Sequence, residues 1–329
     1  MNVSVILCTY NRCGSLASAL KSVAASQFRS PTEWEVLIVD NNSSDQTRAV
    51  AEEFCRNHPG RFRYIFEGQQ GKSNALNRGI RESKAGVLAF MDDDVIADPD
   101  WLENVTAPLK NSMWTGVGGR IVPPLDFSPP AWLALDGPFS MGGILALFDK
   151  GPEGSELSEA PIGTNMAFRK EIFEKYGLFR PDLGPCPGSE IRGEDIEFGR
   201  RVLKGGSHLW YEPSAIVHHA VAENRLQKEY FLRFLYDNGR ALIRGKEPAA
   251  PLWFIPRLYL AVPKIIVSSL LGRTLAWLCS INAQRRFQRK CMVWMNVGQI
   301  VEIFHIISQG KVIGDGQAPP LMIGTEDRK

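Results

Sequence analysis

The chain has 329 residues, of which 44% are hydrophobic and 22% are charged, and its formal net charge is +2. This composition is ordinary for a folded protein and excludes a largely disordered chain, and the length suits one large domain or two smaller ones. The six cysteines form no CxxC pair and show no regular spacing, so we expect reduced thiols, as in a cytosolic protein.

Charge is distributed unevenly along the chain. Residues 225–290 carry 13 Lys or Arg and 3 Asp or Glu, whereas residues 1–224 carry 22 and 29. An acidic body joined to a strongly basic segment predicts a polyanionic partner, such as a membrane surface, a lipid phosphate or a nucleic acid. The apolar run at residues 3–7 is too short for a signal peptide and lacks a basic flank, so we expect a cytoplasmic protein.

Short apolar strands alternate with helical patterns over the first ninety residues. We expect strands at 3–9, 35–39, 63–66 and 87–91, and helices at about 15–25, 45–58 and 74–84. This alternation predicts an α/β fold with a mainly parallel sheet flanked by helices. Ligands of such sheets bind beyond the carboxyl ends of the strands. Three polar clusters fall there: Thr9-Tyr10-Asn11-Arg12, Asp40-Asn41-Asn42 and Asp92-Asp93-Asp94.

The remainder of the chain is less regular. The Pro- and Gly-rich stretch 123–154 predicts a long loop, and such loops are usually functional or mobile. A helical pattern at 193–204 opens with Glu194-Asp195, and helical periodicity continues from residue 225 to about 308, interrupted by prolines. We divide the chain into a domain at 1–224, a basic amphipathic helical region at 225–310, and a flexible tail at 311–329.

Three consecutive carboxylates follow the fourth expected strand. Asp92, Asp93 and Asp94 come directly after the apolar run 87–91, where clustered like charges resist desolvation unless a cation is near. A divalent metal with oxygen ligands, together with a phosphate-bearing substrate, is the partner that this chemistry favours. Taken alone, the triplet fits a solvated acidic turn equally well.

The chain resembles glycosyltransferase family 2 in four motifs, which are residues 3–12, residues 36–45, Asp92-Asp93-Asp94 and Gly193-Glu194-Asp195. The resemblance covers about residues 1–225. It implies a Rossmann-like GT-A fold, a nucleotide-sugar donor, a Mn²⁺ or Mg²⁺ cofactor and inversion at the anomeric carbon. The implied reaction moves a sugar from a nucleoside-diphosphate sugar, with UDP favoured, to a hydroxyl acceptor on a lipid-linked or growing cell-surface glycan.

The resemblance also assigns a nucleotide site. The residues that it matches to nucleoside and diphosphate binding are Thr9, Tyr10, Asn11, Arg12, Asp40, Lys72 and Asn77. Asp40 matches the residue that accepts hydrogen bonds from uracil, and Lys72 stands at a helix start suited to phosphate. The alternatives are that Asn11 serves only a turn and that Asp40 caps the next helix.

The metal site follows from the D-x-D pattern of similar enzymes, whose first Asp lies near the ribose and whose last binds the metal. These positions map to Asp92 and Asp94. Asp93 is grouped with the nucleotide site, although we expect it to point to the other side of the extended chain. His219 matches a histidine that is sometimes a third ligand, but the doublet with His218 leaves the register open, and a simply packed histidine is the alternative.

Asp195 matches the catalytic base of the family, with Glu194 beside it. A carboxylate opposite the leaving diphosphate can take the proton of the acceptor hydroxyl, and inversion needs no enzyme nucleophile. An acid that only interacts with the helix dipole is the alternative. Residues 162–169 match a segment near the donor sugar and acceptor. Trp132 is either a stacking platform for a sugar or a core anchor.

The C-terminal region predicts membrane contact. Residues 258–284 contain only Lys264 and Arg273 as charges, but these and Pro263 interrupt the ~20 apolar residues that a spanning helix needs. We expect helices lying on an anionic membrane surface, peripheral on the inner face of the cell membrane. The aromatic residues expected at headgroup depth are Trp253, Phe254, Tyr259 and Trp277. A soluble helical subdomain and a re-entrant helix are the alternatives.

Other functions explain parts of the sequence. A sugar nucleotidyltransferase also uses a parallel sheet and acidic metal ligands, but it would favour a glycine-rich phosphate loop after the first strand. A membrane-associated nucleotide-sugar or glycan binding module without catalysis would not need both Asp94 and Asp195. No nucleic-acid partner is expected, because it leaves the acidic strand ends unexplained. Two departures from the family stand out: Leu76 replaces a common Arg, and no Q-x-x-R-W motif follows Asp195, which favours single-sugar addition.

Overall fold

The computed structural model describes residues 3–186, 191–246, 262–263 and 265–309. The expected tail at 311–329 lies outside these residues, and so do Trp253, Phe254 and Tyr259.

The centre of the molecule is a nine-stranded sheet with the order β3-β2-β1-β4-β8-β6-β9-β5, in which β7 pairs with β9. Strands β1 to β4 are parallel to one another, β8 runs antiparallel between β4 and β6, and β6 and β9 are parallel. The predicted α/β fold is confirmed, and antiparallel strands in the second half make the sheet mixed. The strands are β1 (Val3–Thr9), β2 (Trp34–Asp40), β3 (Phe62–Phe66), β4 (Val87–Asp92), β5 (Val95–Ala97), β6 (Trp114–Val122), β7 (Ser155–Leu157), β8 (Asn165–Arg169) and β9 (His208–His219).

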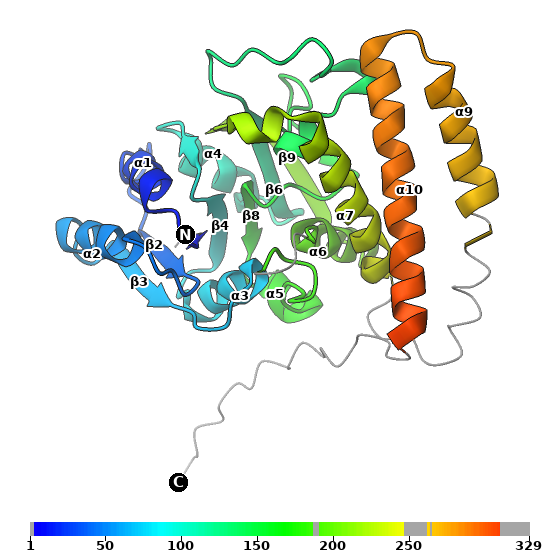
Figure 1. Cartoon of the computed structure of the whole chain (residues 1–329). Helices are drawn as coiled ribbons and strands as arrows, with labels where there is room; N and C mark the ends of the chain where they lie inside the picture. The colour runs from blue at the N-terminus through cyan, green and yellow to red at the C-terminus, as the bar shows by residue number, and fades with distance from the viewer. Residues whose placement is uncertain (1–2, 187–190, 247–261, 264, 310–329) are drawn as a thin grey trace.

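Helices flank the sheet (Figure 1). In α1 the buried residues are Leu16, Ala19, Leu20 and Val23, and this i, i+3, i+4, i+7 spacing puts one apolar stripe against the core. The helices expected at 15–25, 45–58 and 74–84 are confirmed as α1, α2 and α3. The helices are α1 (Cys13–Ala24), α2 (Thr47–Asn57), α3 (Lys72–Glu82), α4 (Trp101–Thr106), α5 (Glu171–Tyr176), α6 (Glu194–Lys204), α7 (Lys228–Lys246), α9 (Gly272–Leu278) and α10 (Ala283–Gln309).

The register of the parallel strands brings the polar clusters together. Thr9 at the end of β1 pairs with Asp40 at the end of β2, and Cys8 pairs with Asp92 at the end of β4. Strands β1, β2 and β4 are almost fully buried along their length, so each of them reaches solvent only at its end. The prediction that these clusters share one rim of the sheet is confirmed.

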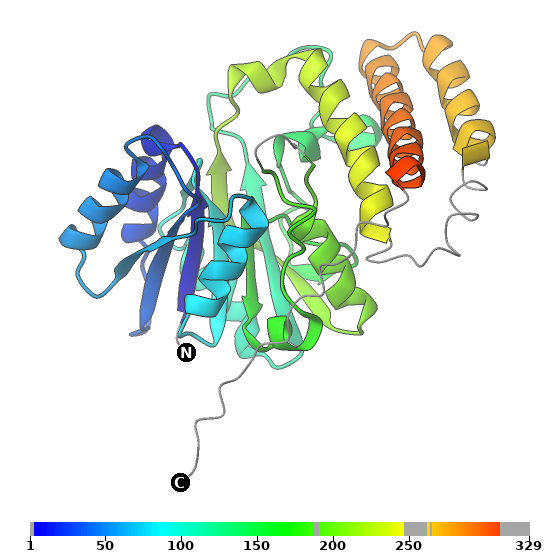
Figure 2. The ribbon, with the colours of Figure 1, turned by 60° about the horizontal axis from the view of Figure 1, so that its bottom comes forward.

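The three C-terminal helices α7, α10 and α9 lie side by side, at the end of the molecule away from α1 and α2 (Figures 1 and 2). Loop 123–154 joins them to the body through a second hydrophobic cluster, whose buried members are Leu133, Met141, Ile144, Leu145, Phe231, Leu235, Phe287 and Cys291. Trp132 packs against Phe231 and Phe287 with ring centroids 5.1 and 4.7 Å apart. Trp132 is therefore a core anchor. The domain boundary at residue 224 stays a prediction.

Helices α7 and α10 approach each other closely. A Cβ atom at Gly298 would lie 2.0 Å from the backbone oxygen of Tyr236, and one at Gly239 would lie 2.0 Å from that of Met295. Only glycine permits this approach. The pair is also joined by Glu302, whose side chain is fully buried in α10. It accepts hydrogen bonds from Nε of Arg240 at 2.8 Å and Nε of Arg244 at 2.5 Å, both in α7.

Candidate active site

Two adjoining cavities lie where β1 and β4 end. The first, of 410 Å³, is lined mostly by polar groups from the ends of β1, β4 and β9, and we call it the polar cavity. The second, of 420 Å³, lies between residues 140–146, the start of α6, and helices α7 and α10, and we call it the mixed cavity. Lys72, Asp92, Arg192 and Arg225 line both, so the two cavities meet at these charged groups.

All three residues of the acidic triplet line the polar cavity. Asp92 is the last residue of β4, and Asp93 and Asp94 form a turn before β5. The expectation that Asp93 points away is wrong, because side chains alternate only along extended chain and the strand has already ended. Burial, with smaller contributions from its acidic neighbours, raises the pKa of Asp93 to about 7, against the lowering effect of Thr9 and Arg12.

Asp94 and His219 form the best candidate for a metal site. Nε2 of His219 lies 3.6 Å from Oδ1 of Asp94, while Nε2 of His218 lies 3.0 Å from Oδ1 of Asp98, outside both cavities. The β5–β9 register, in which Val95 pairs with His219, sets this choice between the two histidines. A separation of 3.6 Å is too long for a hydrogen bond, and these two side chains would together hold a divalent cation.

The donor set of this site fits a cation that also binds phosphate. Among the described residues no group of three His, Cys, Asp or Glu side chains is arranged to hold a metal, so Asp94 and His219 would leave further positions to diphosphate and water. Burial favours the neutral acid at Asp94, but the nearby His219, followed by Arg12 and Arg225, outweighs burial and holds the pKa of Asp94 well below its usual range. Asp94 is therefore ionised at neutral pH, as a ligand must be.

Asp92 is fixed between a lysine and a threonine. Its Oδ1 lies 2.6 Å from Nζ of Lys72, the first residue of α3, and its Oδ2 accepts a hydrogen bond from Thr164 at 2.8 Å. Burial alone would lower the pKa of Lys72, but Asp92 and then Glu194 raise it overall. Lys72 is therefore a permanent cation between the two cavities.

Asp195 lies in the first turn of α6 and lines the mixed cavity. Its Oδ2 accepts a hydrogen bond from the N–H of Gly163 at 2.7 Å, and its Oδ1 accepts one from the N–H of Ile196 at 2.7 Å. The turn at residues 162–164 therefore orients two carboxylates, because Gly163 binds Asp195 and Thr164 binds Asp92. The segment matched to donor sugar and acceptor thus positions carboxylates in both cavities.

Glu194 is buried next to Asp195. Its Oε2 accepts a hydrogen bond from the N–H of Gly193, and its Oε1 lies 4.0 Å from Nζ of Lys72. Burial and then the charge of Asp195 raise the pKa of Glu194 from 4.5 to about 7, despite the attraction of Lys72. Near neutral pH this side chain is divided between its acid and its carboxylate.

The Glu194→Gln substitution is expected to remove a pH dependence of stability. The pKa of Glu194 is higher in the folded than in the unfolded protein. Its contribution to the free energy of unfolding is therefore complete below pH 4.5 and is lost as the pH rises through about 7. Urea unfolding is measured without metal at pH 5 and pH 8. Between these two pH values, the free energy of unfolding of the variant should rise by about 2–3 kcal/mol relative to that of wild type. Parallel pH profiles for the two proteins would contradict the raised pKa.

Three residues predicted to contact nucleotide are instead used within the protein. Asp40 is buried and lines neither cavity, and its carboxylate accepts hydrogen bonds from the N–H of Ser43 and the hydroxyl of Tyr64, both at 2.9 Å. Asn11 adopts a positive φ of 50° and accepts a hydrogen bond from the N–H of Ser44, which is the turn role left open above. The nucleotide contacts predicted for both are not supported.

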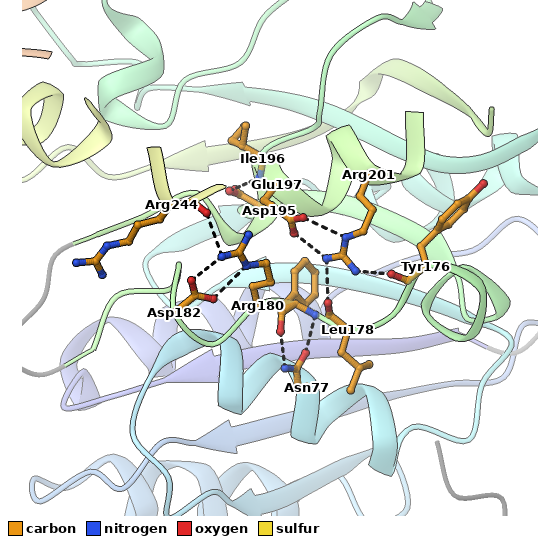
Figure 3. Close-up of polar contacts among 11 residues, drawn as sticks. Asn77, Tyr176, Leu178, Arg180, Asp182, Asp195, Ile196, Glu197, Arg201 and Arg244 are labelled. Carbon is orange, nitrogen blue, oxygen red and sulfur yellow. Dashed lines mark hydrogen bonds and ion pairs between the residues drawn. The ribbon is translucent and has the colours of Figure 1, made fainter. Parts of the chain in front are cut away.

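Asn77 serves as a clamp (Figure 3). Its buried amide donates to the carbonyl oxygen of Phe179 at 2.8 Å and accepts from its N–H at 3.0 Å. The nucleotide contact predicted for Asn77 is likewise not supported, because this clamp uses both ends of the amide. The clamp ties α3 to the segment that follows α5.

The same segment also holds the helix that carries Asp195 (Figure 3). Arg201 of α6 pairs with Glu197 at 2.7 Å and donates to the carbonyl oxygens of Tyr176 and Leu178. Arg180 donates to the carbonyl oxygen of Arg244 at 3.1 Å, near the end of α7. The segment therefore links α3, α6 and α7.

Sequence reasoning missed one residue that meets a predicted carboxylate. Nη2 of Arg225 lies 3.7 Å from Oδ2 of Asp94, whose Oδ2 also lies 2.7 Å from Nη1 of Arg12. Arg225 was recognised only as the start of the basic segment. Its position shortly after the His219 strand was the available signal.

Comparison with known proteins agrees with this geometry. The sequence profile described as glycosyl transferase family 2 matches residues 4–177. Glycosyltransferase AglE of Haloferax volcanii is 29% identical over 230 residues, which is 70% of each chain. The glucosyl-dolichyl phosphate glucuronosyltransferase of the same organism is 25% identical over 238 residues, covering 70% of this chain and 73% of the relative. The succinoglycan biosynthesis protein ExoM of Rhizobium meliloti is 25% identical over 241 residues, covering 73% and 74%.

A solved structure supports the fold. The mannosyltransferase PcManGT of Pyrobaculum calidifontis, in complex with GDP-Man and Mn²⁺, matches with a TM-score of 0.59 at 18% identity, over 91% of this chain and 86% of that chain. This likeness confirms the predicted GT-A fold. The match to the family profile, over more than half of the chain, shows the family. The chain therefore belongs to glycosyl transferase family 2 and is a nucleotide-sugar-dependent glycosyltransferase.

Proposed function

We propose that this enzyme transfers one sugar from a UDP-sugar to a hydroxyl group of a lipid-linked glycan by a single, inverting displacement. The observation that carries the proposal is the junction of the two cavities. Asp94 and His219 lie on the polar side, Asp195 lies on the other side, and Lys72 and Asp92 line both. A donor in the polar cavity and an acceptor in the mixed cavity would therefore meet beside Asp195.

The polar cavity is proposed to hold the nucleoside diphosphate. Thr9, Tyr10 and Arg12 line it, and Arg12 and Arg225 bring two cations to the metal-site carboxylate. A divalent cation, Mn²⁺ or Mg²⁺, bound by Asp94 and His219 would neutralise charge on the leaving diphosphate. UDP is the proposed nucleotide because the motifs at residues 3–12 and 36–45 resemble those of the family, which favour UDP. The mannosyltransferase of similar fold binds GDP-Man, so GDP is the second nucleotide to test.

Asp195 is proposed to act as the base. The acceptor oxygen attacks the anomeric carbon and forms the new glycosidic bond, the bond from that carbon to the diphosphate oxygen breaks, and the hydroxyl proton passes to the Asp195 carboxylate. The N–H groups of Gly163 and Ile196 hold this carboxylate in place. No group of the protein becomes covalently bound to the sugar.

The mixed cavity is proposed to bind an amphiphilic acceptor. Away from its charged groups the wall is mostly apolar, with Ser140 and Asn238 as polar members, and comes from residues 140–146, α7 and α10. The apolar residues of this wall are Met141, Ile144, Phe234, Leu235 and Met292. A sugar hydroxyl next to Asp195 and an apolar carrier along this wall would satisfy both ends of the cavity.

Nucleotide titration tests the donor assignment. UDP, GDP and dTDP are titrated calorimetrically with and without Mn²⁺ into wild type, Asp94→Ala and the matched control Asp98→Ala, whose carboxylate pairs with His218 instead. Wild type should bind UDP most tightly and only with metal. Asp94→Ala should weaken this binding about tenfold or more, and Asp98→Ala should leave it unchanged.

Two results would contradict the proposal. Equal UDP binding by Asp94→Ala and wild type would remove Asp94 from the metal site. If no nucleotide binds to well-folded wild type, the donor assignment is wrong, and a nucleotide-sugar or glycan binding module without catalysis becomes the favoured function.

A further inference from the structure

We infer that α9 and the turn into α10 form a membrane-docking surface that sits on an anionic lipid leaflet without crossing it. This docking surface consists of Leu271, Leu275, Leu278, Ile281 and the basic residues Arg285 and Arg286. It lies away from both cavities and goes beyond the proposed function, since it assigns a partner to a part of the chain that the transfer reaction does not use.

Exposed apolar side chains are concentrated in this part of the molecule. Of the twelve large hydrophobic residues that are exposed among the described ones, seven lie between residues 271 and 304. Leu271, Leu275 and Leu278 follow an i, i+4, i+7 spacing, so they form one stripe, and they are 55–64% exposed. Ile281, in the turn, is fully exposed. Water is a costly surrounding for such a stripe, which marks an interaction surface.

Among the described helices, the position of α9 leaves this stripe uncovered. In both views α9 is the outermost of α7, α10 and α9, and it lies beside α10 (Figures 1 and 2). Nη1 of Arg289 donates to the carbonyl oxygen of Ala276 and the hydroxyl of Ser280, and Nη1 of Arg273 donates to Asn296. These bonds hold α9 on α10, so the exposed leucines are presented on a fixed scaffold.

The positive charge of the docking surface favours an anionic lipid partner. From residue 248 to residue 301 the chain contains no Asp or Glu, whereas it contains seven Lys or Arg. Arg285 and Arg286 are exposed directly after Ile281, so positive charge borders the apolar tip. Apolar side chains at the acyl boundary with basic residues at the headgroups are the pattern of an interfacial helix, and the cytoplasmic leaflet carries the required negative charge.

Packing argues against a membrane-crossing helix. One stretch of the described residues, Ala283–Ser308 in α10, is long and apolar enough to cross a bilayer by length and composition. Glu302 within it is fully buried against Arg240 and Arg244, and Gly298 lies against the α7 backbone. One face of α10 is therefore packed against α7, and a buried ion-paired carboxylate lies within the apolar stretch. Trp277, predicted at headgroup depth, is half-buried, with Nζ of Lys290 5.8 Å from its ring, and its membrane contact stays a prediction.

Vesicle binding by the full-length protein tests the surface. Co-sedimentation is measured with phosphatidylcholine vesicles, with and without phosphatidylglycerol, for wild type and the double variant Leu278→Asp/Ile281→Asp. The matched control is Leu125→Asp, since Leu125 is 99% exposed in loop 123–154 and is not part of the docking surface. The double variant should bind the anionic vesicles about tenfold more weakly or worse, and Leu125→Asp should bind like wild type.

The contribution of the basic residues to binding and the depth of the protein in the membrane are tested separately. Arg285→Ala/Arg286→Ala should weaken binding to anionic vesicles about tenfold and reduce its dependence on salt. An alkaline carbonate wash should release wild type from the vesicles, and retention would overturn the surface mode in favour of a crossing helix. UDP titration of every variant should match wild type, so a failure of the nucleotide site is distinguished from a failure of docking.

Three results would overturn the inference. They are no binding of wild type to anionic vesicles, equal binding to neutral vesicles, and binding by Leu278→Asp/Ile281→Asp that equals wild type. Light scattering on the same proteins identifies a second copy of the chain as the occupant if the double variant loses a dimer instead of vesicle binding.

Discussion

Replacement of Asp195 by Asn is expected to lower the rate of sugar transfer about 10²- to 10⁴-fold while leaving metal-dependent UDP binding intact. The amide cannot accept the proton of the acceptor hydroxyl, but the donor groups lie in the polar cavity, which Asp195 does not line. Single-turnover transfer from the donor that titration identifies measures the first effect, and calorimetry measures the second.

Local geometry sets the controls for this substitution. Both oxygens of Asp195 accept backbone N–H groups, so an amide nitrogen at one position would face a donor and cost about 1–3 kcal/mol of stability. Thermal unfolding therefore accompanies the kinetics. Glu197→Gln, two residues further along α6, removes a charge that pairs with Arg201 and should change the transfer rate little. A transfer rate in Asp195→Asn within a few-fold of wild type would assign the base to another group.

Replacement of Glu302 by Ala is expected to lower the free energy of unfolding by about 3–5 kcal/mol. The fully buried carboxylate pairs with Arg240 and Arg244, and its removal takes this ion pair from Arg244 and leaves Arg240 with Asp237, 3.6 Å away. Urea unfolding measures the change. Glu302→Gln, which keeps one acceptor without the charge, should lie between wild type and the Ala variant.

A surface ion pair provides the matched control. Arg48 and Glu52 are 2.7 Å apart in α2, but their side chains are 70% and 40% exposed. Glu52→Ala should therefore cost no more than about 0.5 kcal/mol. If Glu302→Ala costs as little as Glu52→Ala, the helices α7 and α10 are held by packing alone.

The sequence by itself determined where the chemistry lies along the chain. Buried strands end at Thr9, Asp40 and Asp92, and both signals are local: an apolar run followed by polar residues that cannot be buried unpaired. Alternating strands and helices then require a parallel sheet whose carboxyl ends share one rim. The family motifs added the match of Asp195 to the catalytic base.

Tertiary structure alone decided which polar groups remain available to a ligand. The carboxylate of Asp40 is taken by Tyr64, and the amide of Asn77 is taken by Phe179, 102 residues away. No local pattern reveals such partners, because a side chain's hydrogen bonds depend on which segments the fold brings beside it. The choice of His219 over His218 depended in the same way on the register of β5 and β9.

The C-terminal helices show the same division. Basic charge and interrupted hydrophobicity in the sequence predicted helices in contact with an anionic surface. Which residues face outward followed only from the packing of α10 against α7, where Gly298 and Glu302 are buried and the leucines of α9 are left exposed. Hydrophobic residues are alike in sequence whether they face a core or a membrane, and only their neighbours in the fold distinguish the two.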